Sequence, residues 1–307
     1  MFSLRPMEKS DWSEVASLIY LSTNHWYETK QGHPAFSGGP QVCLLFCQVY
    51  EDLDPGCCLI AEHNETGAIM ASCFYHPRET HVSLGIMNVH PNFFGAGVAS
   101  ALLNEIIDFT KAREMSLRLV SSALNLDSYS LYNRKGFVPT AIYQDMMLEV
   151  PESGIKNSAF DLSQLRNADL KDVSAMGALE LEVSGISRER DYNYFIKNDA
   201  GIWHVSISED KDGQVDGFLV SVNHPGSNML GPGVARNAEV AGNLIINELN
   251  QYKGRTPLFL IPADNRELID AMFSIGAKNC ELHFSQVLGD QQPINGVVMP
   301  TFMPETG

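Results

Sequence analysis

Residues 89–99 read, in order, Val89, His90, Pro91, Asn92, Phe93, Phe94, Gly95, Ala96, Gly97, Val98 and Ala99. The stretch predicts the end of a strand, a turn that contains two glycines, and the start of a helix. The first amides of a helix have no partner within it, and they lie at the positive end of the helix dipole. Glycines also let a phosphate approach the backbone closely. The stretch therefore predicts an anion site whose natural ligand is a pyrophosphate.

Two other interpretations of this turn exist. An isolated G-x-G often forms nothing more than a tight turn. Gly95, Gly97 and Ser100 also fit the dinucleotide fingerprint G-x-G-x-x-G/A loosely, but that fold needs an acidic residue at the end of the next strand. The strand predicted over residues 116–122 ends in serines followed by an alanine, so the sequence argues against a dinucleotide.

The wider sequence around the turn carries a longer pattern. Six positions define it: Val89, Pro91, Asn125, Tyr132, Gly136 and Phe137. Together with the two glycines they resemble the signature of the GNAT superfamily of acyl-CoA-dependent N-acyltransferases, which reads V-x-P, R/Q-x-x-G-x-G/A and N-x6-Y-x3-G-F. The match is specific over residues 81–137. The resemblance implies an α/β fold with a mixed, mostly antiparallel sheet flanked by helices.

The resemblance also implies a co-substrate, acetyl-CoA, and a reaction in which its acetyl group moves directly to a primary amine of a small molecule or peptide. The residues expected to bind the co-substrate are Met87, Asn88, Val89, Asn92, Phe94, Gly95, Ala96, Gly97, Val98, Ala99 and Asn125. The pantetheine arm would lie between strands 81–90 and 116–122 and pair with the backbone of the earlier one like an added strand. Asn92 stands where the family has Arg or Gln, so phosphate contacts are expected to come from backbone amides.

Two catalytic residues follow from the same resemblance. Tyr132 would protonate the departing thiolate, since a phenol and a thiol have similar pKa values; the alternative is a tyrosine that packs in the core. His81 lies eleven residues before Asn92, at the position where some family members carry a Glu that acts as the general base. An imidazole also suits a general base at neutral pH. His81 could equally be an exposed histidine at a strand start, and His90 and Asn88 could act through water instead.

The two halves of the chain read alike. Arg5 precedes Asp11 by six residues, as Arg166 precedes Asp172, and two further correspondences occur in the same order. They predict a duplicated domain, as in bacterial tandem-GNAT proteins. We expect an N-terminal GNAT acetyltransferase domain at 1–150, a linker at 151–158, a divergent GNAT-like domain at 159–288, and a C-terminal tail at 289–307 that extends as an arm over the surface.

The second half departs from the pattern at the residues that matter for chemistry. Asn237 and Glu239 take the places of Gly95 and Gly97 in our alignment, so that a carboxylate stands where phosphate oxygens would lie. Met272 replaces Tyr132. We therefore expect the second domain to be degenerate and to shape the acceptor pocket or a homodimer. For the whole chain, the competing hypothesis is a non-catalytic acyl-CoA-binding or interaction module.

Local patterns also predict individual elements in the first half. Strands are expected at 2–6, 57–63, 68–76, 81–90, 116–122 and near 137–150, and helices at 11–22, 96–113 and 126–135. Residues up to about 54 are expected to form a helix or a long loop.

Composition narrows the class of protein further. The 307 residues are 44% hydrophobic and 19% charged, which is typical of a folded globular chain. The net charge of −16 argues against a nucleic-acid partner and slightly favours a cationic acceptor. The apolar stretches are too short to span a membrane, so we expect no membrane partner and a cytoplasmic location. The cysteines and histidines lack metal-binding spacing, and we expect no metal site.

Overall fold

The computed structural model describes residues 1–305. The chain divides into two compact units. The first unit consists of Met1–Leu119 together with the C-terminal residues from Phe302, and the second unit consists of Val120–Thr301.

The first unit is a sheet in the strand order β1-β2-β3-β4-β5. Its strands are β1 (Phe2–Pro6), β2 (Cys58–His63), β3 (Ile69–Pro77), β4 (His81–Val89) and β5 (Ser116–Ser122), of which β5 ends in the second unit. Its helices are α1 (Trp12–Gln31), α2 (Leu44–Leu53) and α3 (Val98–Lys111), with short 3-10 helices η1 (Lys9–Asp11), η2 (Pro40–Cys43) and η3 (Pro91–Phe93). Neighbouring strands are antiparallel except β4 and β5, which are parallel.

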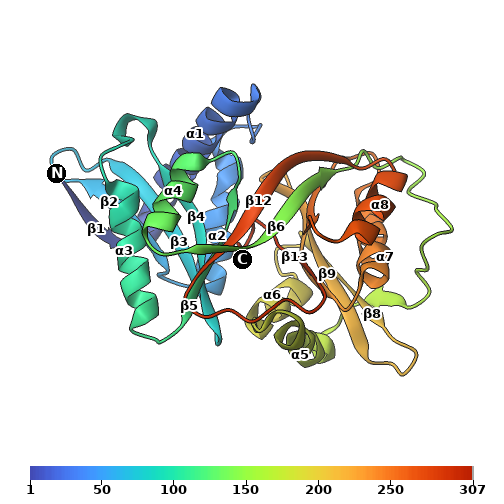
Figure 1. Ribbon diagram of the computed structural model, residues 1–307. Coiled ribbons are helices and arrows are strands. Elements are labelled where there is room, and N and C mark those ends of the chain that lie inside the picture. Colours follow the sequence, from blue (N-terminus) through green and yellow to red (C-terminus); the bar gives the residue numbers. More distant parts are fainter. Residues whose placement is uncertain (306–307) are drawn as a thin grey trace. The chain divides into compact units, whose positions relative to one another are not determined.

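Helices cover both faces of this sheet: α3 lies on one face, and α1 and α2 lie on the other (Figure 1). The buried side of α3 is made by Val98, Leu102, Leu103, Ile106 and Ile107, whose spacing of three to four residues places them on one stripe. Strand β3 is buried along nearly its whole length because helices pack against it from both sides.

The second unit holds the end of β5 and a sheet in the order β12-β6-β11-β10-β9-β8-β7, with β13 paired to β10. Its strands are β6 (Val138–Met147), β7 (Leu165–Asn167), β8 (Trp203–Glu209), β9 (Val215–His224), β10 (Ser227–Ala235), β11 (Leu258–Pro262), β12 (Lys278–Leu288) and β13 (Val297–Met299). Its helices are α4 (Leu126–Arg134), α5 (Val173–Ser184), α6 (Glu189–Lys197), α7 (Ala238–Leu249) and α8 (Arg266–Ser274), with 3-10 helices η4 (Leu170–Asp172) and η5 (Asn250–Tyr252).

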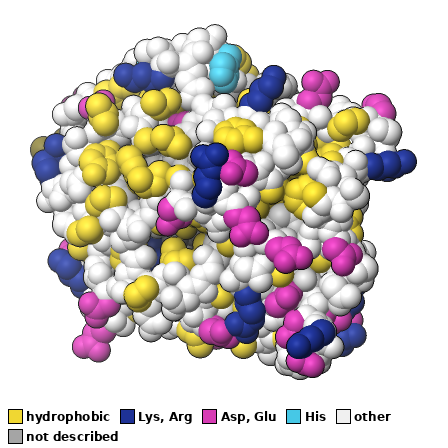
Figure 2. Space-filling view, turned by 45° about the vertical axis from the view of Figure 1, so that its right-hand side comes forward, with side chains coloured by type: hydrophobic (Ala, Val, Ile, Leu, Met, Phe, Trp, Pro, Cys, Tyr) yellow, Lys and Arg dark blue, Asp and Glu magenta, His cyan; other side chains and the backbone are white. Residues whose placement is uncertain are grey.

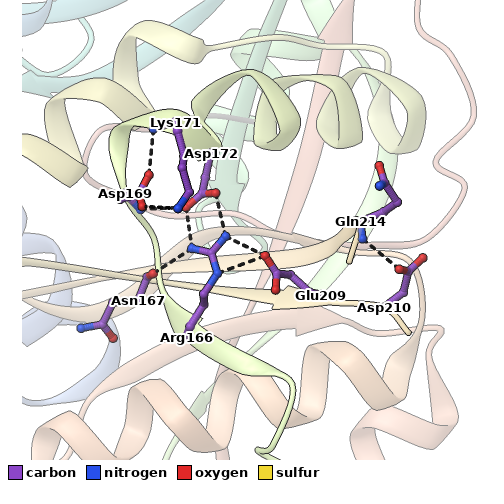
Figure 3. Close-up of polar contacts among 8 residues, drawn as sticks. All are labelled: Arg166, Asn167, Asp169, Lys171, Asp172, Glu209, Asp210 and Gln214. Atoms are coloured by element: carbon purple, nitrogen blue, oxygen red, sulfur yellow. Dashed lines mark hydrogen bonds and ion pairs between the residues drawn. The ribbon is translucent and has the colours of Figure 1, made fainter. Parts of the chain in front are cut away.

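The same ion cluster occurs once in each unit. In the second unit, Nη1 of Arg166 lies 2.7 Å from Oδ2 of Asp172, and Nη2 of Arg166 lies 2.7 Å from Oε1 of Glu209 (Figure 3). Asp172 also accepts a hydrogen bond of 2.8 Å from the amide of Asp169, which fixes the turn that starts η4 and α5. These ion pairs and this hydrogen bond thus connect the first strand of the repeat to its first helix.

In the first unit, Nη1 of Arg5 lies 2.7 Å from Oδ2 of Asp11, and Nη2 of Arg5 lies 2.8 Å from Oε2 of Glu62. The amide of Glu8 donates a hydrogen bond of 2.7 Å to Asp11, as Asp169 does to its partner in the other unit. This repeated local geometry is what the internal duplication predicts. The predicted fold class, a mixed and mostly antiparallel sheet flanked by helices, is confirmed.

The C-terminal tail differs from its prediction. β13 pairs antiparallel with residues 233–235 of β10, and Val297, Met299 and Met303 are almost fully buried. The expectation of an arm over the surface was therefore wrong, because the apolar residues of the tail are used for strand pairing and packing. The tail contributes to the interior of both units, each through its own residues.

Two surface properties bear on function. Within residues 1–305, the helices are all too short or too polar to cross a bilayer. On the face drawn in Figure 2, acidic side chains are spread among basic and hydrophobic ones, in keeping with the net charge of −16.

Candidate functional site

The turn after β4 has the backbone that the anion site requires. Gly95 and Gly97 adopt φ values of 77° and 78°, in the left-handed region that other residues occupy only with strain. Both glycines are exposed. Gly97 is the N-cap of α3, and as a glycine it has no side chain that could accept a hydrogen bond from the first amides of the helix. These amides therefore have no capping side chain at the positive end of the helix dipole, a position that favours an anion.

The other residues of the turn fall into two groups. Asn92 and Ala96 are exposed, and Phe94 is 57% exposed. Val98 is buried in the first turn of α3, where its side chain packs in the core of the first unit. The amide of Asn92 donates a hydrogen bond of 3.1 Å to Nδ1 of His90, which closes the short η3 turn.

Strand β4 is paired with β5 along only part of its length. Residues 81–83 pair with residues 116–118, and within the described chain the pairing stops there. On the other side of β4 the register with β3 shifts between Leu84 and Met87, which places a bulge at Gly85 and Ile86. Met87 and Val89 lie beyond the bulge and are half-buried. This segment of β4 has the extended backbone expected of a strand that pairs with a pantetheine arm.

Asn88 and His81 have contacts that limit what they can do. The Nδ2 atom of Asn88 donates hydrogen bonds to Oγ of Ser22 at 2.7 Å and Oγ1 of Thr23 at 3.2 Å, so its side chain is held against α1. His81 is fully buried at the start of β4, and its Nδ1 lies 3.0 Å from Oγ1 of Thr80. At about 3.3 Å per residue, His81 lies about 13 Å along the strand from the bulge. Its role as a base stays a prediction.

A carboxylate that the sequence did not single out lies at the bulge. The amide of Ile86 is hydrogen-bonded to the buried side chain of Glu305, and the hydroxyl of Tyr50 donates a hydrogen bond of 2.5 Å to the same carboxylate. Burial raises the pKa of Glu305 to about 8. No local pattern could have placed a residue from the C-terminus at this position.

Asn125 and Tyr132 lie where the motif predicts, at the start and in the last turns of α4. Oδ1 of Asn125 accepts a hydrogen bond of 3.1 Å from the amide of Ser128 and so caps the helix. Tyr132 is 7% exposed, and its ring centre lies 5.7 Å from that of Phe137. Gly95, Gly97 and Met87 thus lie in the first unit, and Asn125 and Tyr132 lie in the second. The chemical role of the tyrosine stays a prediction.

The second repeat closes the helix end that the first leaves open. α7 begins at Ala238, and its N-cap Asn237 accepts a hydrogen bond of 3.0 Å from the amide of Val240. Because Asn237 is the N-cap, it corresponds to Gly97, and the sequence alignment that placed Glu239 there was wrong by two residues. The physical reason is that the β10–α7 connection is shorter than the β4–α3 connection. Glu239 lies instead in the first turn of the helix, where its negative charge interacts favourably with the positive end of the helix dipole.

The second repeat also fills the place beside its splayed strand. Like β4, β10 has a register shift, between Leu230 and Gly233. Beyond the shift, residues 233–235 pair with Val297–Met299 of β13. A strand of the chain itself therefore hydrogen-bonds to the segment of β10 that corresponds to Met87 and Val89 in β4.

Three potential metal ligands meet although the sequence spacing predicted no metal site. Asp145, Glu281 and His283 each bring a ligand atom within 4.8 Å of the others. Asp145 comes from β6 and the other two from β12, so strand register assembles the cluster. Sequence spacing carries no signal for it.

Two family models match the chain. The acetyltransferase (GNAT) family matches residues 21–137, and an acetyltransferase (GNAT) domain matches residues 176–292. No curated protein gives a significant match.

Several solved structures share the fold over almost the whole chain. A putative acetyltransferase from Pyrococcus horikoshii has a TM-score of 0.77 at 15% identity and covers 99% of this chain and 96% of its own. A GCN5-related N-acetyltransferase from Sphaerobacter thermophilus has a TM-score of 0.64 at 16% identity, with 96% and 97% covered. A tandem GNAT protein from the clavulanic acid biosynthesis pathway has a TM-score of 0.60 at 13% identity, with 94% and 98% covered. At these identities the likeness establishes the fold alone.

Proposed function

Because the chain belongs to the GNAT family and carries two such domains in tandem, we propose that its first domain transfers an acetyl group from acetyl-CoA to a primary amine of a small molecule or peptide. The proposed first domain spans 1–150 and the second 159–288, joined by a linker at 151–158. The open N-terminus of α3, preceded by Gly95 and Gly97 in left-handed conformations, is the observation that carries this proposal.

The amides at the start of α3 suit the pyrophosphate of acetyl-CoA. Each hydrogen bond from an amide to a charged oxygen contributes roughly 1.5–3 kcal/mol, and the helix dipole adds to it. The uncharged Asn92 supplies no counter-charge, which makes these amides the main anchors. The segment of β4 from Met87 to Val89 would pair with the pantetheine amides.

The second domain is proposed to have lost acyl-CoA binding. Asn237 uses its side chain to satisfy an amide that a phosphate would need, and β13 pairs with β10 where a pantetheine arm would lie. Both features favour a domain that keeps the fold without the co-substrate.

Acetyl transfer requires that the amine be neutral when it attacks and that the leaving thiolate of CoA be protonated. Tyr132 is proposed to protonate the thiolate, since it occupies the motif position on α4. Tyr132→Phe is expected to reduce turnover at least tenfold and leave acetyl-CoA affinity unchanged. Turnover unaffected by this change would remove the tyrosine from the mechanism.

Calorimetric titration with acetyl-CoA tests the proposal. We expect one site per chain, and Gly97→Glu should abolish it by placing a carboxylate beside the diphosphate. Gly213→Glu is the matched control, because Gly213 has φ of 77° and an added side chain there meets nothing within 4 Å. Two sites would contradict the assignment of the second domain. No binding by the unaltered chain would contradict the proposed function.

A further inference from the structure

Three rings meet beside the turn after β4 in the first unit. The ring centre of Phe93 lies 6.1 Å from that of His63, at an interplanar angle of 21°, and 5.7 Å from that of His90, at 56°. All three residues are half-buried, so the group is partly exposed at the surface. We call these three residues the ring cluster.

Strand pairing places the ring cluster next to the anion site. β2 and β4 both pair antiparallel with β3, so the end of β2, the start of β3 and the end of β4 lie at the same end of the sheet. The amide of His90 donates a hydrogen bond of 2.8 Å to the carbonyl of Met70 at this end. The amide of Ala96 donates one of 3.2 Å to the carbonyl of Phe93, which joins the ring cluster to the turn that the proposed function assigns to the diphosphate.

Each imidazole of the ring cluster has one nitrogen engaged within the chain. The amide of Asn92 donates a hydrogen bond of 3.1 Å to Nδ1 of His90, so the proton of the neutral ring is on Nε2. Nδ1 of His63 lies 3.1 Å from Oγ1 of Thr66. Within the part of the chain that the structure describes, the two Nε2 atoms have no hydrogen-bond partner. Each ring therefore has a nitrogen that can donate a hydrogen bond to a ligand, and a doubly protonated ring adds a positive charge.

The second repeat has a carboxylate at the position of His63. His63 and Asp210 each follow the glutamate that pairs with the arginine of their ion cluster. The amide of His63 donates a hydrogen bond of 2.9 Å to the carbonyl of Ala68, and that of Asp210 donates one of 2.8 Å to the carbonyl of Gln214, so the two positions correspond. The side chain of Asp210 accepts a hydrogen bond from the amide of Gln214 (Figure 3). The domain proposed to have lost acyl-CoA binding thus has a negative charge, which repels phosphate, where the first domain has an imidazole.

Acetyl-CoA carries a second anion that needs a partner. Besides the diphosphate, its ribose bears a phosphate monoester on the 3′ oxygen, a group with a charge of about −1.5 to −2 at neutral pH. The uncharged Asn92 gives the turn no side-chain counter-charge, and the amides at the start of α3 are assigned to the diphosphate. The imidazoles beside the turn suit the remaining phosphate, because N–H groups form their strongest hydrogen bonds with charged oxygens.

We propose that His63 and His90 form a site for the 3′-phosphate of acetyl-CoA, in which Nε2 of each ring donates a hydrogen bond to a phosphate oxygen. Phe93 is a positioning residue, because its ring contacts both imidazoles. The inference rests on the proposed function. It gives the first domain the ability to distinguish acetyl-CoA from the form that lacks the 3′-phosphate.

Calorimetric titration with acetyl-CoA and with acetyl-3′-dephospho-CoA tests the site. The unaltered chain should bind acetyl-CoA about 100-fold more tightly, because the second ligand loses two hydrogen bonds to charged oxygens. His63→Asn and His90→Asn should each weaken acetyl-CoA binding about tenfold and leave the affinity for the dephospho ligand unchanged. The double variant should bind the two ligands equally. Asparagine is chosen because its amide lies near the position of Nδ1 and cannot reach as far as Nε2.

Two kinds of control accompany these variants. His63→Gln and His90→Gln keep an amide N–H near the position of Nε2, so they should retain part of the preference for acetyl-CoA. His33→Asn changes an exposed histidine of the same unit, whose Nδ1 lies 3.3 Å from the carbonyl of Pro34, and should leave both affinities unchanged. Unchanged binding of the dephospho ligand shows that a variant is folded. If one asparagine variant fails to fold, the other tests the site, because each histidine makes its own contact.

Three outcomes would overturn the inference. Equal binding of the two ligands by the unaltered chain would show that the 3′-phosphate has no site. A preference that persists in the double variant would place that phosphate elsewhere. An equal loss of affinity for both ligands in folded variants would show that the histidines only shape the turn. An unaltered chain that binds neither ligand would overturn the proposed function itself, and this result is read before any variant is made.

Discussion

Helices α3 and α7 begin at corresponding places in the two repeats, yet their first amides have different partners. α3 starts after Gly97, which has no side chain, whereas α7 starts after Asn237, whose side chain accepts a hydrogen bond from Val240. A capping side chain and a bound anion compete for the same amides. The comparison teaches that a side chain that caps a helix also occupies an amide that an anion would need.

The strand beside β10 offers the strongest way to test this comparison. Met299 of β13, which pairs with the splayed strand β10, is 2% exposed, whereas Met87, on the splayed strand β4 of the first repeat, is half-buried. Met299→Ala should lower the free energy of unfolding by about 2–5 kcal/mol, because it leaves a cavity in the core. Met87→Ala should cost about 1 kcal/mol. Urea denaturation followed by circular dichroism measures both, and equal losses would show that β13 is not part of the core.

The pH dependence of stability gives a second test of the comparison, because each unit contains a buried glutamate. Each unit has a tyrosine hydroxyl bonded to a buried glutamate: Tyr50 to Glu305, and Tyr192 to Glu180. Glu180 also pairs with the guanidinium of Arg188 at 2.5 Å, whereas the bonds to Glu305 come from a hydroxyl and an amide.

The pKa of Glu305 is raised to about 8 from an ordinary value of 4.5, so the folded state holds a proton that the unfolded state releases between these pH values. The stability of the wild type should therefore fall as pH rises from about 5 to 8, by about 4 kcal/mol at about 1.4 kcal/mol per pH unit. Glu305→Gln should remove this fall, and the exposed Glu65→Gln should not. Melting temperatures measured across this range decide the matter, and parallel curves for all three proteins would contradict it.

The smallest expected effect belongs to the cap itself. Asn237→Ala should destabilise the protein by about 1 kcal/mol, since the amide of Val240 loses its partner. It should not create a second acetyl-CoA site, because β13 still pairs with β10. Chemical denaturation and calorimetry on the same variant check both statements, and a second site would show that the cap alone had closed the domain.

Local sequence patterns predicted much of the first repeat. Strands 2–6 and 116–122 match β1 and β5, and the Gly95–Gly97 turn precedes α3 as expected. α1 continues to Gln31 instead of ending near residue 22, because it ends only where Gly32 adopts φ of 80°. Capping residues and glycines act over a few positions, so their signal is visible in one sequence.

Features that depend on distant contacts were beyond such patterns. Glu305 lies at the β4 bulge, and Asp145 meets His283 only because β6 pairs with β12. The burial of the tail was missed for the same reason: the sequence around Val297 and Met299 has too little hydrophobic periodicity to predict a strand. Strand register and tail docking are set by partners more than sixty residues away, which periodicity cannot identify.

β13 also has a consequence for how the two domains respond to the concentration of acetyl-CoA. A tethered strand is present at an effective concentration that its connection to the chain sets, and no metabolite level changes this concentration. In the proposed function, the first domain fills and empties as acetyl-CoA rises and falls. In the same proposal, β13 takes the place of the co-substrate in the second domain, so that the shape of this domain does not depend on the acetyl-CoA concentration.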